Sequence, residues 1–109
     1  MFKNIKKVHF VGIGGIGMSG IAEILLSQGF EISGSDRALT EITNRLSDIG
    51  IKIYEGHSPD NLNDADVLVY SSAVDTDNPE VRAALERKIP IIKRSEMLAE
   101  CMRMKYVHI

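Results

Sequence analysis

The sequence predicts an α/β fold, a Rossmann-like doubly wound parallel sheet, and two observations carry this prediction. Apolar β-type segments alternate with segments of helical periodicity along the chain, which is the pattern of successive βαβ units. The first β-type segment runs into a G-x-G-x-x-G turn formed by Gly12, Gly14 and Gly17, which opens into a helical pattern. With right-handed crossovers, we expect about five strands in the order 3-2-1-4-5.

Three strands and two helices are expected in the first half of the chain. Strands are predicted over residues 8–11, 30–35 and 51–54. Helices are predicted over about residues 15–28 and from Thr40, an N-cap, and they end at Gly29 and Gly50. Gly17 and Gly20 are expected to allow close helix packing. The apolar positions expected to face the sheet are Ile16, Ile21, Ile24 and Leu25 in the first helix and Ile42, Leu46 and Ile49 in the second.

The second half of the chain repeats this alternation. A continuous apolar run over residues 66–70 suits a parallel strand that is covered on both faces. Asp77 and Asn78 precede Pro79, which predicts a helix start at this proline. A short strand over residues 89–92 and a helix capped by Ser95 follow. The apolar positions of these two helices are Val81, Ala84 and Leu85 in the first and Met97, Leu98, Cys101 and Met102 in the second.

The glycine-rich turn predicts a site for a nucleotide diphosphate. Its first glycine permits a tight bend, the second lets a pyrophosphate approach the backbone, and the third lets the helix pack closely on the strand. No Lys or Arg occurs between Lys7 and Arg37, so backbone N–H groups and the helix dipole would hold the phosphates. Asp36 follows Gly17 by 19 residues, near the spacing of a carboxylate that accepts from a ribose hydroxyl, although it could also be a turn carboxylate.

Other polar residues follow the predicted strands and should meet at the same edge of the sheet. His9 lies within a strand and is therefore interpreted as structural. Asp48, Asp60, Asp64 and Asp66 are interpreted as capping or solvated turn residues. We expect no catalytic or metal-binding residue in this chain. The residues predicted to bind the nucleotide are Gly12, Ile13, Gly14, Gly15, Ile16, Gly17, Ser35, Asp36, His57, Ser71, Ser72 and Ala73.

Composition excludes several classes of protein. The 109 residues allow one domain, and the net charge of −2 without a basic stripe argues against nucleic-acid binding. No apolar run is long enough to span a membrane, and the first residues do not begin a signal peptide. Cys101 is the only cysteine, so a disulfide within the chain is excluded. We expect a cytoplasmic protein.

The end of the sequence predicts a boundary. Residues 105–109 have the pattern of an opening β-strand, with nothing after them for the strand to join. We therefore expect a nucleotide-binding domain over residues 1–104, and over residues 105–109 the start of a strand that leads into an absent domain.

Several motifs resemble the amino-terminal domain of the Mur ligase family. These are the stretch from His9 to Ala22, the Ser33-Gly34-Ser35-Asp36 segment, Gly56-His57, Ser71-Ser72-Ala73-Val74, Asn78-Pro79-Glu80 and Arg94-Ser95-Glu96-Met97-Leu98. The resemblance covers the whole chain. It implies a bacterial enzyme of peptidoglycan synthesis whose first domain binds the UDP part of UDP-N-acetylmuramate, while absent domains bind ATP with Mg²⁺ and an amino acid.

Within this family, the motifs favour the member that adds L-alanine to UDP-N-acetylmuramate. The member that attaches recycled murein tripeptide to the same nucleotide sugar remains an alternative, as do an NAD-binding dehydrogenase domain and a regulatory nucleotide-sensing domain. The sequence contains no G-x-x-x-x-G-K-[ST] motif to hold the phosphates of ATP. We therefore expect this chain to bind its ligand without catalysing the ligation.

Overall fold

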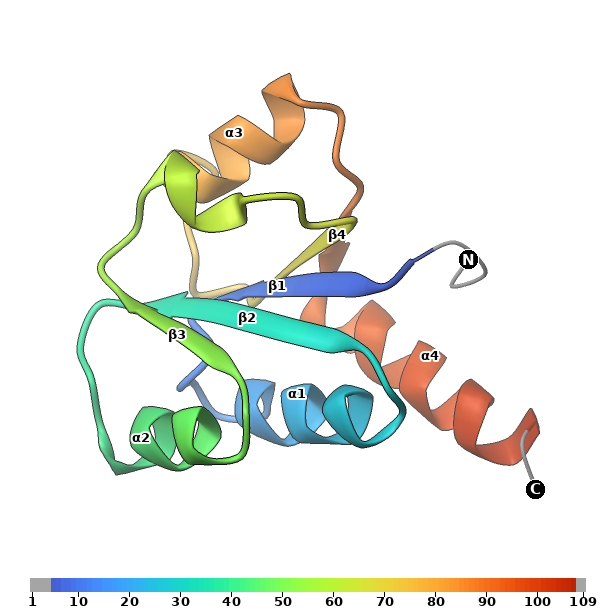
Figure 1. Ribbon diagram of the computed structural model, residues 1–109. Helices are drawn as coiled ribbons and strands as arrows, with labels where there is room; N and C mark the ends of the chain where they lie inside the picture. The colour runs from blue at the N-terminus through green and yellow to red at the C-terminus, as the bar shows by residue number, and fades with distance from the viewer. Residues whose placement is uncertain (1–4, 108–109) are drawn as a thin grey trace.

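The computed structural model describes residues 5–107, and these residues form one parallel sheet flanked by helices (Figure 1). The strand order is β3-β2-β1-β4-β5 and all neighbouring strands are parallel, which confirms the predicted fold and order. The elements are β1 (Lys7–Val11), α1 (Met18–Ser27), β2 (Glu31–Asp36), α2 (Glu41–Asp48), β3 (Lys52–Glu55), the 3₁₀ helix η1 (Pro59–Leu62), β4 (Val67–Tyr70), α3 (Pro79–Glu86), β5 (Ile91–Lys93) and α4 (Arg94–Val107).

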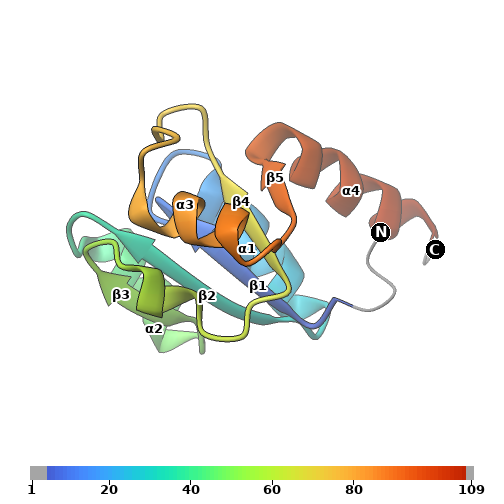
Figure 2. The same cartoon turned by 90° about the horizontal axis from the view of Figure 1, so that it is seen from above.

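The helices form two layers, one on each face of the sheet. Helices α1, α2 and α4 lie on one face, while α3 and η1 lie on the other (Figures 1 and 2). The alternation of side chains along β1 divides its residues between these layers. Val8 and Phe10 belong to the apolar core under α1, whereas Val11 belongs to a smaller apolar core under α3. His9 also faces α3, where it is fully buried.

Several helix faces differ from the prediction. Ile16 is fully exposed, and Ile24, Ile42 and Ile49 are more than 40 % exposed. In α1, Met18 and Ala22 are buried together with the predicted Ile21 and Leu25, and in α2 Thr43 is buried beside the predicted Leu46. In α3, Leu85 is 62 % exposed, while Glu80 is fully buried. The prediction was wrong at Ile16, Ile24, Ile42, Ile49 and Leu85, because it placed apolar residues inward wherever helical spacing allowed. It also did not expect polar helix residues to be buried.

The starts of two helices also differ. Helix α1 begins at Met18 rather than near Gly15, because Gly17 has a φ of 81° and interrupts helical geometry. Helix α4 begins at Arg94, so Ser95 lies inside it and does not cap it. Thr40 and Asn78 cap α2 and α3 as predicted, and Pro79 is the first residue of α3. Glycines with positive φ follow α1 and α2, as expected.

The predicted strand at the end of the sequence is wrong where it can be compared. Residues 105–107 belong to α4, which continues from Arg94 to Val107, and His108 and Ile109 lie outside the described residues. A helix satisfies the backbone groups of this segment without a neighbouring strand. The side chain of Met97 is buried as predicted and Leu98 is 37 % exposed, while those of Cys101 and Met102 lie outside the described part.

Candidate functional site

A hollow of about 480 Å³ lies at the carboxyl ends of β1, β2 and β4. Strands β1 and β4 flank the point where the strand order reverses, which is where doubly wound sheets bind their ligands. Six of the predicted binding residues line it, and Arg37, Val74, Asp75, Asp77 and Asn78 complete the lining. The six predicted residues are Gly12, Gly15, Asp36, His57, Ser71 and Ala73.

Most N–H groups of the glycine-rich turn are used within the chain. Those of Gly12 and Ile13 donate to the carbonyl of Ser35 at 2.8 and 3.1 Å, and that of Gly15 donates to the carbonyl of Gly12 at 3.0 Å. Among the described residues, no acceptor faces the N–H groups of Ile16 and Gly17, which lie directly before α1. No side chain caps this helix, so its free N–H groups and positive dipole end are available to an anion.

Asp36 is held against the turn by its own carboxylate. Its Oδ2 accepts from the N–H of Gly14 at 2.9 Å and its Oδ1 accepts from the N–H of Arg37 at 2.8 Å. A Cβ atom at Gly14 would lie 3.0 Å from both Asp36 Oδ2 and Thr43 Cγ2. The small residue at position 14 therefore makes room for Asp36 and α2, whereas the prediction expected open space for a ligand there. Asp36 also lines the hollow, which leaves it able to contact a ligand.

The close helix–strand contact predicted at Gly17 and Gly20 lies elsewhere. A Cβ atom at Gly20 would meet nothing within 4 Å, and one at Gly17 would lie 2.9 Å from Arg94 Nη1. The tight contact is between Gly34 of β2 and Ile13, whose side chain is fully buried in the core. Ile13 therefore anchors the turn to the sheet by its side chain.

Arg94 is a positively charged residue that the prediction did not expect near the turn. It opens α4, and this helix packs against α1, so its guanidinium reaches Gly17 although the two residues are far apart in sequence. No carboxylate among residues 5–107 pairs with Arg94 within 4 Å. A positively charged side chain thus lies beside the turn, where the prediction expected backbone groups alone.

His57 is connected to a buried network behind the hollow. Its Nδ1 lies 2.8 Å from Ser35 Oγ, and Ser35 Oγ lies 2.8 Å from Glu80 Oε1. Ser35 and Glu80 are fully buried, and Glu80 also contacts His9. His9 thus takes part in a buried hydrogen-bond network, which agrees with its interpretation as a structural residue. Burial alone would raise the pKa of Glu80, but hydrogen bonds from His9, Asn61 and Ser35 stabilise the carboxylate and hold its pKa below the ordinary value.

The segment after β4 forms the other wall of the hollow. The N–H of Val74 donates to the carbonyl of Ser71 at 3.0 Å and closes a turn. Ser71 and Ala73 line the hollow, whereas Ser72 is exposed outside its lining. This wall offers hydroxyl and backbone groups opposite Asp36 and His57.

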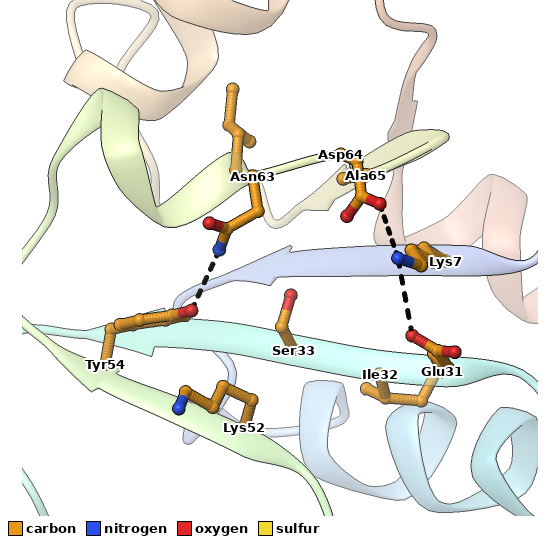
Figure 3. Close-up of a pocket in the computed structure, with 10 residues that line it drawn as sticks. Lys7, Glu31, Ile32, Ser33, Lys52, Tyr54, Asn63, Asp64 and Ala65 are labelled. Atoms are coloured by element: carbon orange, nitrogen blue, oxygen red, sulfur yellow. Dashed lines mark hydrogen bonds and ion pairs between the residues drawn. The ribbon is translucent and has the colours of Figure 1, made fainter.

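A second hollow, of about 300 Å³, lies on the η1 side of the sheet, where residues early in β1, β2 and β3 line it (Figure 3). Its side chains largely satisfy one another, because Lys7 pairs with Asp64 and Glu31, and Asn63 donates to the hydroxyl of Tyr54 at 2.9 Å. It is separate from the glycine-rich turn. The hollow at the carboxyl ends of the strands is therefore the candidate ligand site.

Two further properties of the described residues bear on function. Within residues 5–107, no group of three or more His, Cys, Asp or Glu side chains is arranged to hold a metal ion. None of the helices in the described part of the chain combines the length and apolar character needed to cross a membrane.

The fold and the site together define a doubly wound α/β domain, with a glycine-rich turn, a carboxylate after the second strand and a hollow between them. The model of the family described as "Mur ligase family, catalytic domain" matches residues 7–106. The chain therefore belongs to the Mur ligase family, as its motifs indicated.

Similar proteins define this relationship more closely. The UDP-N-acetylmuramate–L-alanine ligase of Geotalea uraniireducens (strain Rf4) is 61 % identical over 106 residues, which are 97 % of this chain and 23 % of that protein. The crystal structure of the UDP-N-acetylmuramate-alanine ligase from Thermotoga maritima has a TM-score of 0.87 and 41 % identity, and the match covers 90 % of this chain and 23 % of that one.

A solved relative with a different name is also similar. The UDP-N-acetylmuramate:L-alanyl-gamma-D-glutamyl-meso-diaminopimelate ligase from Neisseria meningitides has a TM-score of 0.80 and 34 % identity, over 88 % of this chain and 31 % of that one. The chain thus spans about a quarter of the length of the curated relatives it matches, 23 % in the first of them.

Glu80, Asn61 and Arg94 are the site residues that sequence reasoning missed. One signal was present for Glu80, because a histidine inside an apolar strand needs a buried polar partner. Arg94 belongs to one of the motifs that resemble the Mur ligase family, but helical periodicity alone does not place it near the turn. Its position depends on how α4 packs beside α1.

Proposed function

We propose that this chain binds the UDP portion of UDP-N-acetylmuramate, as part of a cytoplasmic bacterial ligase that uses ATP to join L-alanine to this nucleotide sugar in peptidoglycan synthesis. The observation that carries the proposal is the hollow beside the glycine-rich turn, lined by Asp36, His57 and Ser71, in a chain of the Mur ligase family. Relatives that are 55–61 % identical bear the name of the alanine-adding ligase, which favours it over the tripeptide ligase.

In this proposal the diphosphate lies at the start of α1. The unpaired N–H groups of Ile16 and Gly17 donate to phosphate oxygens, and the Arg94 guanidinium supplies a charge beside them. Gly12 and Gly15 line the adjoining wall, and the N–H groups of Gly12 to Gly15 hold the turn in shape rather than the ligand.

The nucleoside then occupies the rest of the hollow. Asp36 accepts from a ribose hydroxyl with the lone pairs that its two backbone hydrogen bonds leave free. His57 on one side and the Ser71–Ala73 turn on the other contact the base or ribose.

ATP and Mg²⁺ do not fit the described residues. The sequence holds no P-loop motif, and residues 5–107 hold no cluster of metal-ligating side chains. We assign ATP, Mg²⁺ and L-alanine to parts of the ligase beyond the quarter of its length that this chain matches, and we derive no step through them.

Thermal unfolding of the 109-residue chain in parallel with UDP-N-acetylmuramate, UDP, NAD, ATP and L-alanine tests the proposal. At a hundredfold excess over the dissociation constant, a ligand that binds only the folded state stabilises it by about 2.7 kcal/mol, which raises Tm by roughly 10 °C in a chain of this size. We expect this shift with UDP-N-acetylmuramate and a similar one with UDP. A larger shift with NAD than with UDP would overturn the proposal in favour of a dinucleotide site.

A pair of neighbouring substitutions tests the phosphate position. Arg94→Gln should weaken UDP binding about tenfold, since it removes a charge-assisted hydrogen bond. Lys93→Gln removes the same charge one residue away, from an exposed side chain, and should leave the affinity within twofold. Equal losses in the two variants would mean that only the net charge matters.

A further inference from the structure

Glu80 is a buried carboxylate on which four hydrogen-bond donors converge. Its Oε1 accepts from His9 Nε2 and from Ser35 Oγ. Its Oε2 accepts from the N–H of Ser58 at 3.1 Å and from Asn61 Nδ2 at 2.9 Å. Side chains from β1, β2 and η1 and the backbone N–H of Ser58 thus meet one residue of α3. The N–H groups of Ser58 and Asn61 can only donate, and these hydrogen bonds hold the pKa of Glu80 below its ordinary value, so the carboxylate is ionised near neutral pH and accepts from all four partners.

The hydrogen bond from Ser35 to Glu80 determines the direction of the hydrogen bond between Ser35 and His57. A serine hydroxyl carries one proton, and that of Ser35 is used in the bond to Glu80 at 2.8 Å. Ser35 Oγ and His57 Nδ1 are also 2.8 Å apart, and in this hydrogen bond Nδ1–H of the imidazole must then donate to Ser35 Oγ. A neutral His57 therefore carries its proton on Nδ1, and its Nε2 keeps a lone pair.

That lone pair is available to a ligand. The side chain of His57 is 17 % exposed and lines the hollow with Asp36, and no described residue lies within hydrogen-bond distance of its Nε2. We infer that Glu80, acting through Ser35 and through its own contact with His57 (Oε2 to Nδ1, 3.5 Å), holds His57 as a hydrogen-bond acceptor that takes the imide N–H of a uracil base. The inference rests on the proposed function and assigns its base specificity to His57, with Glu80 and Ser35 as positioning residues.

The consequence is selection of uridine over cytidine. The ring nitrogen N3 of uracil carries a proton, whereas that of cytosine is an acceptor and would face the acceptor of His57. An unmatched pair of buried polar groups weakens binding by about tenfold or more. We expect UDP to bind at least tenfold more tightly than CDP, with the same ribose and diphosphate in both ligands.

Glu80→Gln reverses the direction of the relay without changing its shape. The N–H of Ser58 cannot reverse, and Asn61 is oriented by its bond to the carbonyl of Gly56 at 3.1 Å, so the Gln oxygen must face these two donors. Its NH₂ group then donates to Ser35, and Ser35 donates to His57 Nδ1. His57 carries its proton on Nε2 as a result and loses the acceptor.

The experiment combines NMR of the histidine ring nitrogens with calorimetric titration of UDP and CDP into the 109-residue chain. At about pH 8, where an ordinary imidazole is neutral, we expect the Nδ1–H form of His57 in the unchanged chain and the Nε2–H form in Glu80→Gln. The preference for UDP over CDP should fall below about threefold in that variant. Glu86→Gln, an exposed position on the same helix, should change neither result.

The outcomes separate this inference from the proposed function. An Nε2–H form of His57 in the unchanged chain, or equal affinities for UDP and CDP, would overturn the inference and leave UDP binding intact. A failure to bind UDP would overturn the proposed function, and the base contact with it. If Glu80→Gln does not fold, His57→Phe tests the base contact, because it keeps a ring at this position without the Nε2 acceptor and should remove the preference for UDP over CDP. Retention of that preference in His57→Phe would refute the inference.

Discussion

Gly34→Ala should destabilise the fold through a single contact. An added Cβ atom would lie 2.5, 2.7 and 2.9 Å from Cδ1, Cβ and Cγ2 of Ile13, well inside the 3.5–4.0 Å at which carbon atoms are in contact. Ile13 is fully buried in the core under α1, so it cannot retreat without moving its neighbours. Overpacking of this kind costs about 1–3 kcal/mol. For a chain of 109 residues, this corresponds to a fall in Tm of roughly 4–12 °C.

Urea unfolding monitored by circular dichroism measures this effect, with Gly20→Ala as the matched control. Gly20 lies in α1 with nothing within 4 Å of an added Cβ, so alanine there should stabilise the chain by about 0.5 kcal/mol. Ile13→Ala removes two of the three clashing atoms, so the Gly34→Ala/Ile13→Ala double variant should lose less stability than the sum of the two single losses. An unchanged urea midpoint for Gly34→Ala would refute the packing argument.

Three further predictions concern carboxylates. Asp36→Asn keeps one oxygen for the N–H of Gly14 but loses its charge, so it should weaken UDP binding about tenfold by calorimetry; an unchanged affinity would exclude Asp36 as a ligand contact. Hydrogen bonds hold the pKa of Glu80 below its ordinary value of 4.5, so its stabilising contribution is complete above that pH and is lost as the pH falls through the folded-state pKa. As the pH is lowered, the free energy of unfolding should therefore fall less steeply in Glu80→Gln than in the unchanged chain. Equal slopes in the two chains would contradict this. Asp66→Ala removes an acceptor of two backbone N–H groups, so it should lower the free energy of unfolding by about 1 kcal/mol and with it the urea midpoint. Asp64→Ala, the control, breaks only an exposed pair with Lys7 and should leave the midpoint unchanged. Equal effects of the two changes would contradict the role assigned to Asp66.

The sequence by itself determined the architecture of this chain. The glycine-rich turn after an apolar strand is typical of a doubly wound sheet, which has this strand order. Pro79 directly after Asn78 is typical of a helix start, and α3 begins there. The same topology explains why Asp36, His57 and Ser71 could be predicted to share one hollow. Carboxyl ends of neighbouring parallel strands meet at one edge whatever side chains pack elsewhere.

Only the tertiary structure decided which groups of the site are free and which are occupied. The N–H of Gly14 is taken by Asp36, Arg94 reaches Gly17 from a distant helix, and Glu80 is buried. Each of these depends on a contact between residues more than 20 positions apart. Helical and strand periodicity describes how a segment is oriented, but it contains no information about which polar side chain of another segment lies opposite. Hydrogen-bond pairing across the core supplies that information, because a buried donor or acceptor must find its partner wherever the fold places it.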